Sequence, residues 1–295
     1  MNLLLPALIG GIAYGVPLFL VASGLTLVYG VLRVLNFAHG GLLMIGAYLF
    51  AWALGGRTVS VWVFIGGIIG AGVVVGLLGI VVERGMFSRL YGAGTEVSLL
   101  GSYGLLLFLI GVAPLIWGNA PLTQALPSAL SGQVTIAGAP VSVYEFVEVG
   151  TGVAVAVGLF FLLKRTRLGV QATAVAEDRE MARALGIRAA RVSGLVFVLG
   201  CALAGLAGAV VAPTTSVSTD LASSFILSAF AAVIIGGLGS VEGALIAAIG
   251  LGIIDSLCVT YLPSVEPYSF YIVLAIMLIV RPQGLLGRRQ ALGQF

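Results

Sequence analysis

The sequence predicts an all-α polytopic membrane protein with about nine (8–10) transmembrane segments. Three observations lead to this fold class. The chain of 295 residues is 60% hydrophobic and only 8% charged, whereas soluble domains carry about 25% charged residues. The mean hydropathy is +1.18, so lipid must be the solvent for most of the surface. The 43 glycines favour the close helix–helix contacts that are common in bilayers.

Apolar runs of spanning length, about 20 residues each, follow one another along the chain. Six of them lie near 5–31, 37–54, 61–82, 97–117, 142–163 and 192–212. Further runs near 222–237, 243–260 and 268–280 are either three spans or one full span with two half-length segments. Pro17, Pro114 and many glycines lie within or beside these runs, so we expect broken or re-entrant helices. Residues 1–295 are predicted to form a single transmembrane domain.

One polar stretch interrupts the apolar pattern. Residues 164–191 hold seven of the 14 Lys and Arg residues. Because cytoplasmic loops are rich in these residues, we place this loop in the cytoplasm. Alternating outward from it puts 13 of the 14 basic residues and the C-terminus inside, with Arg57 as the exception. The outer side then receives the N-terminus and the loop at 118–141, where Gly, Pro, Ser and Thr predict turns or a short hairpin.

The polar loop is also predicted to form one short cytoplasmic amphipathic helix. Val170, Ala174, Met181 and Leu185 fall on one face of a continuous helix. Gly169 opens the segment and Gly186 ends it. The apolar face would bind a groove on another protein, or, as the alternative, would lie on anionic lipid.

Glycine-containing interruptions join apolar runs in both halves of the chain, at 36–41 and at 236–243. Paired interruptions point to a midplane site or gate in transporters with internal repeats. Ordinary tight turns between spans are the competing interpretation, and helix capping competes with a pathway role for the polar residues at 36 and 39. The candidate residues for a translocation path or gate are Asn36, His39, Gly239 and Ser240.

Asp255 completes this set because it lies inside the apolar run 243–260. A carboxylate within a membrane is costly unless it faces protein or water, so it either lines the pathway or pairs with a neighbouring helix. Catalytic chemistry is disfavoured, since the chain has one lysine and one histidine and carries no phosphate-binding or zinc-binding motif. We expect no enzymatic activity, metal or cofactor.

Four blocks of sequence resemble the branched-chain amino-acid ABC transporter permease family. They are GLTLVYGVLRVLNFAHGGLLMIGAY (24–48), TRLGVQATAVAEDREMARALGI (166–187), AAVIIGGLGSVEGALIAAIGLGIID (231–255) and RPQGLLG (281–287). The resemblance is closer to the H subunit of the Liv-type importer than to its M partner, through the NFAHG and RPQGLLG blocks. The chain departs from the family at 171–173, where a basic residue is usual.

The resemblance implies a permease subunit of the bacterial inner membrane. Its expected partners are a second, M-type permease subunit, two ATP-binding subunits, a periplasmic substrate-binding protein and membrane lipid, with no nucleic acid. The implied function is import of branched-chain amino acids or a related small solute by ATP-driven alternating access; an ion-coupled secondary transporter is the alternative. The family's ATPase-coupling segment carries over to Gly169, Ala176, Asp178, Ala182 and Gly186.

Overall fold

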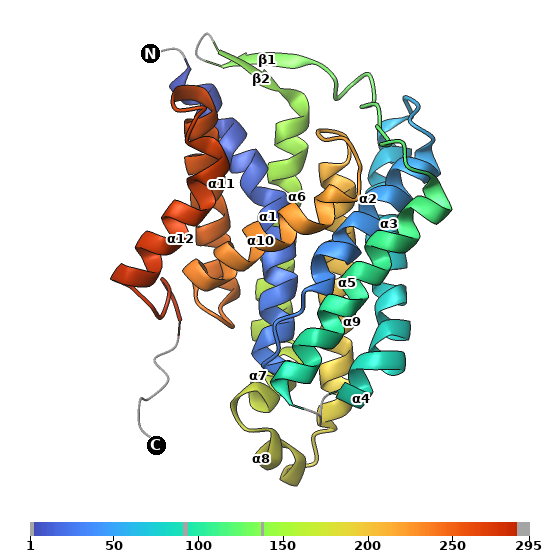
Figure 1. Cartoon of the computed structure of the whole chain (residues 1–295), viewed down its shortest axis with the longest axis vertical. Coiled ribbons are helices and arrows are strands. Elements are labelled where there is room, and N and C mark those ends of the chain that lie inside the picture. Colours follow the sequence, from blue (N-terminus) through green and yellow to red (C-terminus); the bar gives the residue numbers. More distant parts are fainter. Residues whose placement is uncertain (1–2, 91–93, 137–138, 288–295) are drawn as a thin grey trace.

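The computed structural model describes residues 3–90, 94–136 and 139–287, which form a bundle of helices with one small β-hairpin (Figure 1). The longer helices are α1 (Leu4–Leu32), α2 (Ala38–Leu54), α3 (Val61–Val82), α5 (Thr95–Trp117), α6 (Val143–Arg165), α9 (Ala189–Val211), α10 (Asp220–Gly236), α11 (Val241–Tyr261) and α12 (Ser269–Val280). The shorter elements are a π-helix η1 (Glu83–Phe87), α4 (Ser88–Leu90), α7 (Arg167–Glu177), α8 (Arg179–Ala184), a 3-10 helix η2 (Glu266–Tyr268), and strands β1 (Gln133–Ile136) and β2 (Ala139–Ser142).

Every predicted apolar run is a helix, but the count of about nine spans is not confirmed. Within the described residues, six helices are long and apolar enough to cross a membrane, while α2, α10 and the segment 266–280 are shorter. The 17 residues of α10 extend about 26 Å, less than the roughly 30 Å of a hydrocarbon core. In the last hundred residues, α11 has the length of a full span, and α10 and α12 are shorter apolar helices.

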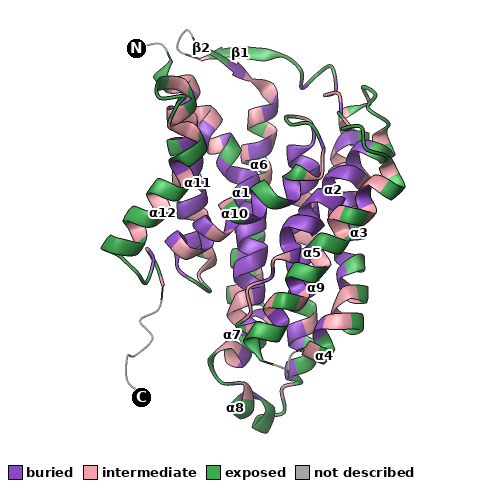
Figure 2. Ribbon diagram, viewed as in Figure 1, coloured by how far each residue is buried: buried purple, intermediate pink, exposed green. Residues whose placement is uncertain are grey.

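The core forms where α1, α2, α9 and α11 pack together, and Figure 2 shows their buried residues at the centre of the bundle. Small residues make this contact possible, because they let helix backbones approach closely. A Cβ atom on Gly24 of α1 would lie 2.7 Å from the carbonyl oxygen of Gly200 in α9. A Cβ on Gly15 of α1 would likewise lie 2.8 Å from the Cα of Ile249 in α11. Glycines at these positions therefore allow α1 to pack closely on α9 and α11.

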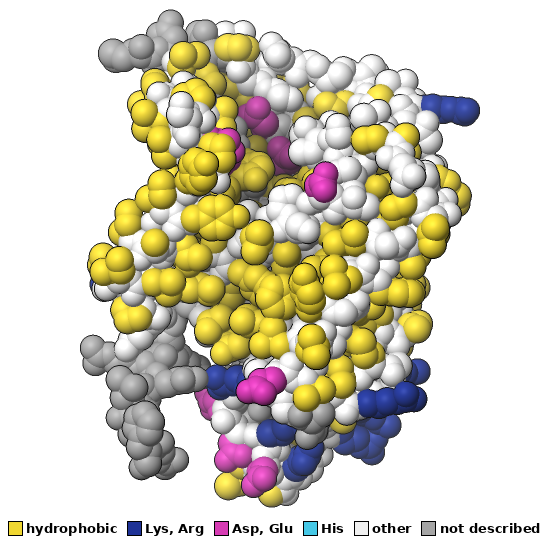
Figure 3. Space-filling view, viewed as in Figure 1, with side chains coloured by type: hydrophobic (Ala, Val, Ile, Leu, Met, Phe, Trp, Pro, Cys, Tyr) yellow, Lys and Arg dark blue, Asp and Glu magenta, His cyan; other side chains and the backbone are white. Residues whose placement is uncertain are grey.

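The predicted loop at 118–141 contains the expected hairpin. Strands β1 and β2 are antiparallel, with Val134 opposite Val141. The fold therefore contains a two-stranded sheet that the all-α prediction did not include. The same loop pairs with the 212–219 connection, since the Leu122 N–H donates to the Val217 carbonyl oxygen at 3.0 Å and the Val217 N–H donates back at 2.8 Å. The hairpin lies at one end of the bundle and α7 and α8 lie at the other (Figure 1). Figure 3 shows most Lys and Arg side chains gathered at the end that carries α7 and α8.

Candidate coupling segment and helix breaks

The polar segment folds as two helices, so the prediction of one continuous coupling helix is wrong. Asp178 separates them: its side chain accepts hydrogen bonds from the backbone N–H groups of Glu180 and Met181, both at 2.9 Å, and so caps α8. A carboxylate is among the preferred acceptors at a helix N-terminus. Thr166 caps α7 in the same way by accepting from the Gly169 N–H at 3.2 Å. The segment is therefore a helix–cap–helix unit.

One face of this unit packs on the bundle. Gly169, Ala172 and Val175 of α7 and Ala182 of α8 are buried, and α7 contacts α1, α6 and α9. Gly169 fits tightly, because a Cβ there would overlap the carbonyl oxygens of Leu162 and Leu163 at the end of α6. Ala176 is half-buried. Gly186 follows α8 with a φ of 84°, in the left-handed region that glycine reaches without strain, as its predicted role at the helix end requires.

The other face leaves apolar side chains uncovered. Val170, Met181 and Leu185 are 64%, 58% and 74% exposed. The break at Asp178 distributes them over both helices and the turn after α8, so they do not form the single helical stripe that their spacing predicts. These three exposed apolar side chains lie at the same end of the bundle, on the part of the coupling segment that does not pack on the helices.

The first break, between α1 and α2, is held by a polar pair and a buried histidine. The Asn36 side-chain oxygen accepts from the Ala38 N–H at 3.0 Å, and its amide nitrogen lies 3.1 Å from Nδ1 of His39. His39 is fully buried. Its Nε2 is next to Gly24 and Gly200, where added Cβ atoms would lie 3.1 and 3.2 Å away. Asn36 and His39 thus fix the start of α2 against α1 and α9.

The second break, between α10 and α11, is closed by the segment that follows α12. The Leu285 N–H donates to the Ile235 carbonyl oxygen at 2.7 Å, and the Leu286 N–H donates to the Gly236 carbonyl oxygen at 3.0 Å. The carbonyl groups at the end of α10 therefore obtain partners that a helix end otherwise lacks. Ser240 then caps α11, since its hydroxyl accepts from the Gly243 N–H at 3.0 Å.

The two breaks lie beside each other. A Cβ on Gly239 would lie 3.8 Å from the Cα of Gly30, near the end of α1. The rings of Phe37 and Phe230 also meet edge to face with centroids 4.7 Å apart. The structure thus brings the candidate residues of the two breaks into one region. Asp255 is elsewhere, since it lies 14 residues after the start of α11, about 21 Å along the helix axis.

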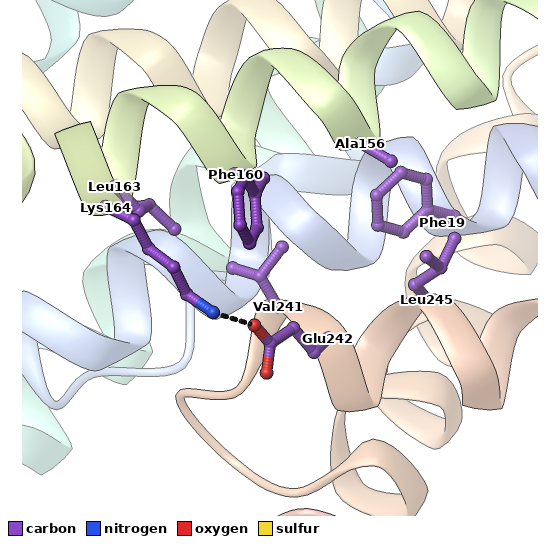
Figure 4. A pocket seen from close by; sticks show the side chains of 8 residues that line it. All are labelled: Phe19, Ala156, Phe160, Leu163, Lys164, Val241, Glu242 and Leu245. Carbon is purple, nitrogen blue, oxygen red and sulfur yellow. Dashed lines mark hydrogen bonds and ion pairs between the residues drawn. The ribbon is translucent and has the colours of Figure 1, made fainter.

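Side-chain bonds connect the coupling segment to each break. At the first break, Arg33 adopts a left-handed φ of 57°, and its Nη2 donates to the Ala176 carbonyl oxygen of α7 at 3.1 Å. At the second break, Nζ of Lys164 at the end of α6 donates to Oε1 of Glu242 at 2.8 Å (Figure 4). Sequence reasoning placed Lys164 in the loop 164–191, whereas it lies in the last turn of α6, and it found neither of these long-range contacts.

Buried acids occupy the opposite half of the bundle. Asp255 accepts a hydrogen bond from the Ser269 hydroxyl at 3.0 Å, which fixes the first residue of α12 to α11. Glu148 of α6 is only 5% exposed. Sequence analysis missed it, although a carboxylate within an apolar run at 142–163 is the same signal that singled out Asp255.

Figure 3 shows acidic side chains around a hollow in this half of the molecule. A cavity of about 310 Å³ lies there between α1, α10 and α12, with Tyr14, Ser228, Glu266 and Phe270 among its lining residues. Within the ranges that the structure describes, no three His, Cys, Asp or Glu side chains are grouped to hold a metal ion.

Comparison with known proteins agrees with the resemblance. Residues 7–281 match the family described as branched-chain amino acid transport system / permease component. The high-affinity branched-chain amino acid transport system permease protein LivH of Salmonella typhimurium is 30% identical, with 96% of each chain covered. The corresponding permease protein BraD of Pseudomonas aeruginosa is 28% identical, again with 96% of each chain covered.

Among solved structures, PsaBC from Streptococcus pneumoniae in complex with Fab gives a TM-score of 0.46 at 18% identity, covering 98% of this chain and 94% of that chain. The match to the family covers almost the whole chain, including both breaks and the coupling segment. The chain is a multi-pass membrane protein that belongs to the family of branched-chain amino acid ABC transporter permeases.

Proposed function

We propose that this chain is a membrane-spanning subunit of an ATP-driven importer that moves branched-chain amino acids, or a related small amphipathic solute, across the inner membrane. The observation that carries this proposal is the coupling segment, which exposes Val170, Met181 and Leu185 and is bonded to both helix breaks. Complete burial of such a side chain contributes about 1.5–3 kcal/mol. Burial of these side chains in a groove of an ATP-binding subunit would contribute favourably to docking.

The two bonded contacts supply a route from that docking surface to the membrane helices. A displacement of α7 pulls on Arg33 through the Ala176 carbonyl group, and a displacement of the end of α6 pulls on Glu242 through Lys164. Arg33 ends α1, and Glu242 is in the first turn of α11. Closure of an ATPase dimer would therefore shift both breaks together, as alternating access by rigid-body movement requires.

The proposed assembly contains two ATP-binding subunits, a second permease subunit and a periplasmic binding protein. The coupling segment and the C-terminus lie in the cytoplasm, and the β-hairpin faces the binding protein. Residues 1–295 act as one transmembrane domain. In this arrangement Asn36, His39, Gly239 and Ser240 belong to the gate. Asp255 is the further candidate for the translocation path, in the outer half, where Glu148 is a second buried carboxylate.

The test is leucine uptake into liposomes that contain the chain and its second permease subunit, with and without the ATP-binding subunits and the binding protein. We expect ATP-dependent uptake only in the complete assembly. Val170→Asp should abolish uptake and co-purification of the ATP-binding subunits, because it places a charge in an apolar contact. Ala190→Asp adds the same charge at an exposed position in the first turn of α9 and should leave both intact. Undiminished uptake with Val170→Asp would overturn the docking role.

An ion-coupled secondary transporter is the second candidate, and the buried carboxylates Glu148 and Asp255 favour it. Intramembrane acids are the usual proton-carrying groups of such transporters. The discriminating measurement is leucine uptake by the chain alone in liposomes under an imposed proton gradient. Uptake under those conditions would establish the second candidate, whereas its absence together with ATP-dependent uptake in the complete assembly would exclude it.

A further inference from the structure

An apolar crevice opens on the side of the bundle, between α6 and α11 (Figure 4). Both helices pack on α1, and Phe19 of α1, which is fully buried, forms the floor. The crevice has a volume of about 150 Å³. Its apolar lining residues are Phe19, Ala156, Phe160, Leu163, Val241 and Leu245.

Water is a poor occupant for this space, because apolar cavities offer it no hydrogen-bond partners and stay dry. An empty crevice is also unfavourable, since the atoms that line it lose their dispersion contacts. Helices α6 and α11 are both of membrane-spanning length and composition, so hydrocarbon chains surround the crevice. An acyl chain is the occupant that matches the lining.

The mouth of the crevice carries one positive and one negative group. Lys164 Nζ lies 2.8 Å from Oε1 of Glu242 and 4.6 Å from the centroid of the Phe160 ring. Both charged side chains are more than half exposed. An ammonium group has three donors and a carboxylate has two acceptor oxygens. Within the described residues, the ion pair is the one hydrogen bond that Lys164 Nζ and the Glu242 carboxylate make. It leaves further donors on Lys164 and the Oε2 atom of Glu242 free.

We propose that this crevice binds a zwitterionic phospholipid with a primary ammonium group, phosphatidylethanolamine. Its acyl chain lies on Phe19 between α6 and α11, its phosphate accepts from the free donors of Lys164, and its ammonium group donates to Oε2 of Glu242. A quaternary choline headgroup has no N–H to donate, and a purely anionic headgroup supplies no donor for Oε2 of Glu242. The inference goes beyond the transport function and requires only that the chain is embedded in a membrane.

The lipid would bear on coupling as well, because its headgroup lies at the end of α6, where the coupling segment begins. Lys164 is two residues before Thr166, which caps α7. A bound lipid would hold Lys164 and Glu242 in their observed positions and fill the space that separates α6 from α11. Binding itself can be measured without any transport assay, so the two proposals fail independently.

The test uses the full chain in phosphatidylcholine vesicles that contain a small fraction of phosphatidylethanolamine with a photoreactive group in its acyl chain. After illumination, mass spectrometry should find the label on peptides that contain 156–163 and 241–245. Ala156→Phe fills the crevice and should lower labelling by roughly tenfold, which corresponds to about 1.4 kcal/mol of binding. Val153→Phe, on an exposed position of the same helix, is the matched control and should not change it.

Headgroup recognition is tested by competition in the same vesicles. Unlabelled phosphatidylethanolamine should displace the probe more effectively than phosphatidylcholine, and Glu242→Gln should remove that preference while the acyl-chain contact persists. Leu245→Phe fills the crevice from the opposite wall and should lower labelling as Ala156→Phe does. Agreement between the two variants shows that the loss of labelling is not caused by misfolding of one of them. Equal labelling of Ala156→Phe and Val153→Phe, or equal competition by the two lipids, would overturn the proposal.

Discussion

The cap at Asp178 allows a quantitative prediction for the coupling segment. The Asp178 side chain accepts two hydrogen bonds of 2.9 Å from the N–H groups that open α8. Replacing such a cap by alanine costs about 1 kcal/mol. Because α8 has six residues, it is too short to persist on helix propensity alone. We therefore expect Asp178→Ala to open α8 locally, with the unfolded population rising roughly fivefold for 1 kcal/mol.

The assay is amide hydrogen exchange of the full, detergent-solubilised chain, followed by mass spectrometry on peptides that cover 179–186. Asp178→Ala should raise the exchange rate there by roughly fivefold, with no change in peptides from α1 or α9. Asp178→Asn is the matched control, because asparagine caps as well as aspartate but carries no charge. Unchanged exchange with alanine, or equally fast exchange with asparagine, would refute the capping account and assign Asp178 to a charge contact.

Three further predictions concern contacts between helices. Gly200→Leu should lower the thermal denaturation temperature, because a Cβ there would lie 2.7 Å from Val28 Cγ2. Overpacking of this kind costs about 1–3 kcal/mol. Gly66 has open space around it, so Gly66→Leu should change the denaturation temperature little. Lys164→Glu or Glu242→Lys alone should lower ATP-driven uptake and the combined exchange should restore it; failure of the combination would exclude a role for the ion pair. Asp255→Leu should reduce folded protein in size-exclusion chromatography, because the Ser269 hydroxyl loses its acceptor, whereas Asp255→Asn retains an oxygen and should fold normally.

The sequence predicts the helices well, because each apolar run of suitable length leaves a clear hydropathy signal. The predicted run at 61–82 coincides with α3, and the others differ by a few residues. Hydropathy does not fix the length of a helix, and α10 and α12 are apolar but shorter than the other candidate spans of that half. The number of spans therefore could not be predicted from composition.

For the coupling segment, hydrophobic periodicity predicted a helix but not its interruption. The spacing of Val170, Ala174, Met181 and Leu185 fits a single helix, but periodicity takes no account of a side chain that caps within the segment. Asp178 followed by Glu180 carried the local signal for a new helix start, since acidic residues are favoured there. Contacts such as that between Lys164 and Glu242 join residues 78 positions apart. No periodic pattern encodes such a separation, so the hydrogen bonds from the coupling segment to the two breaks could not be predicted from the sequence.

The hydrogen bonds between α10 and the segment after α12 have a consequence for biosynthesis. The carbonyl groups of Ile235 and Gly236 obtain their partners from Leu285 and Leu286, about fifty residues later in the chain. During synthesis the ribosome must therefore deliver α11 and α12 before the end of α10 can be sealed. The end of α10 therefore obtains its final hydrogen bonds only after α12 has been made.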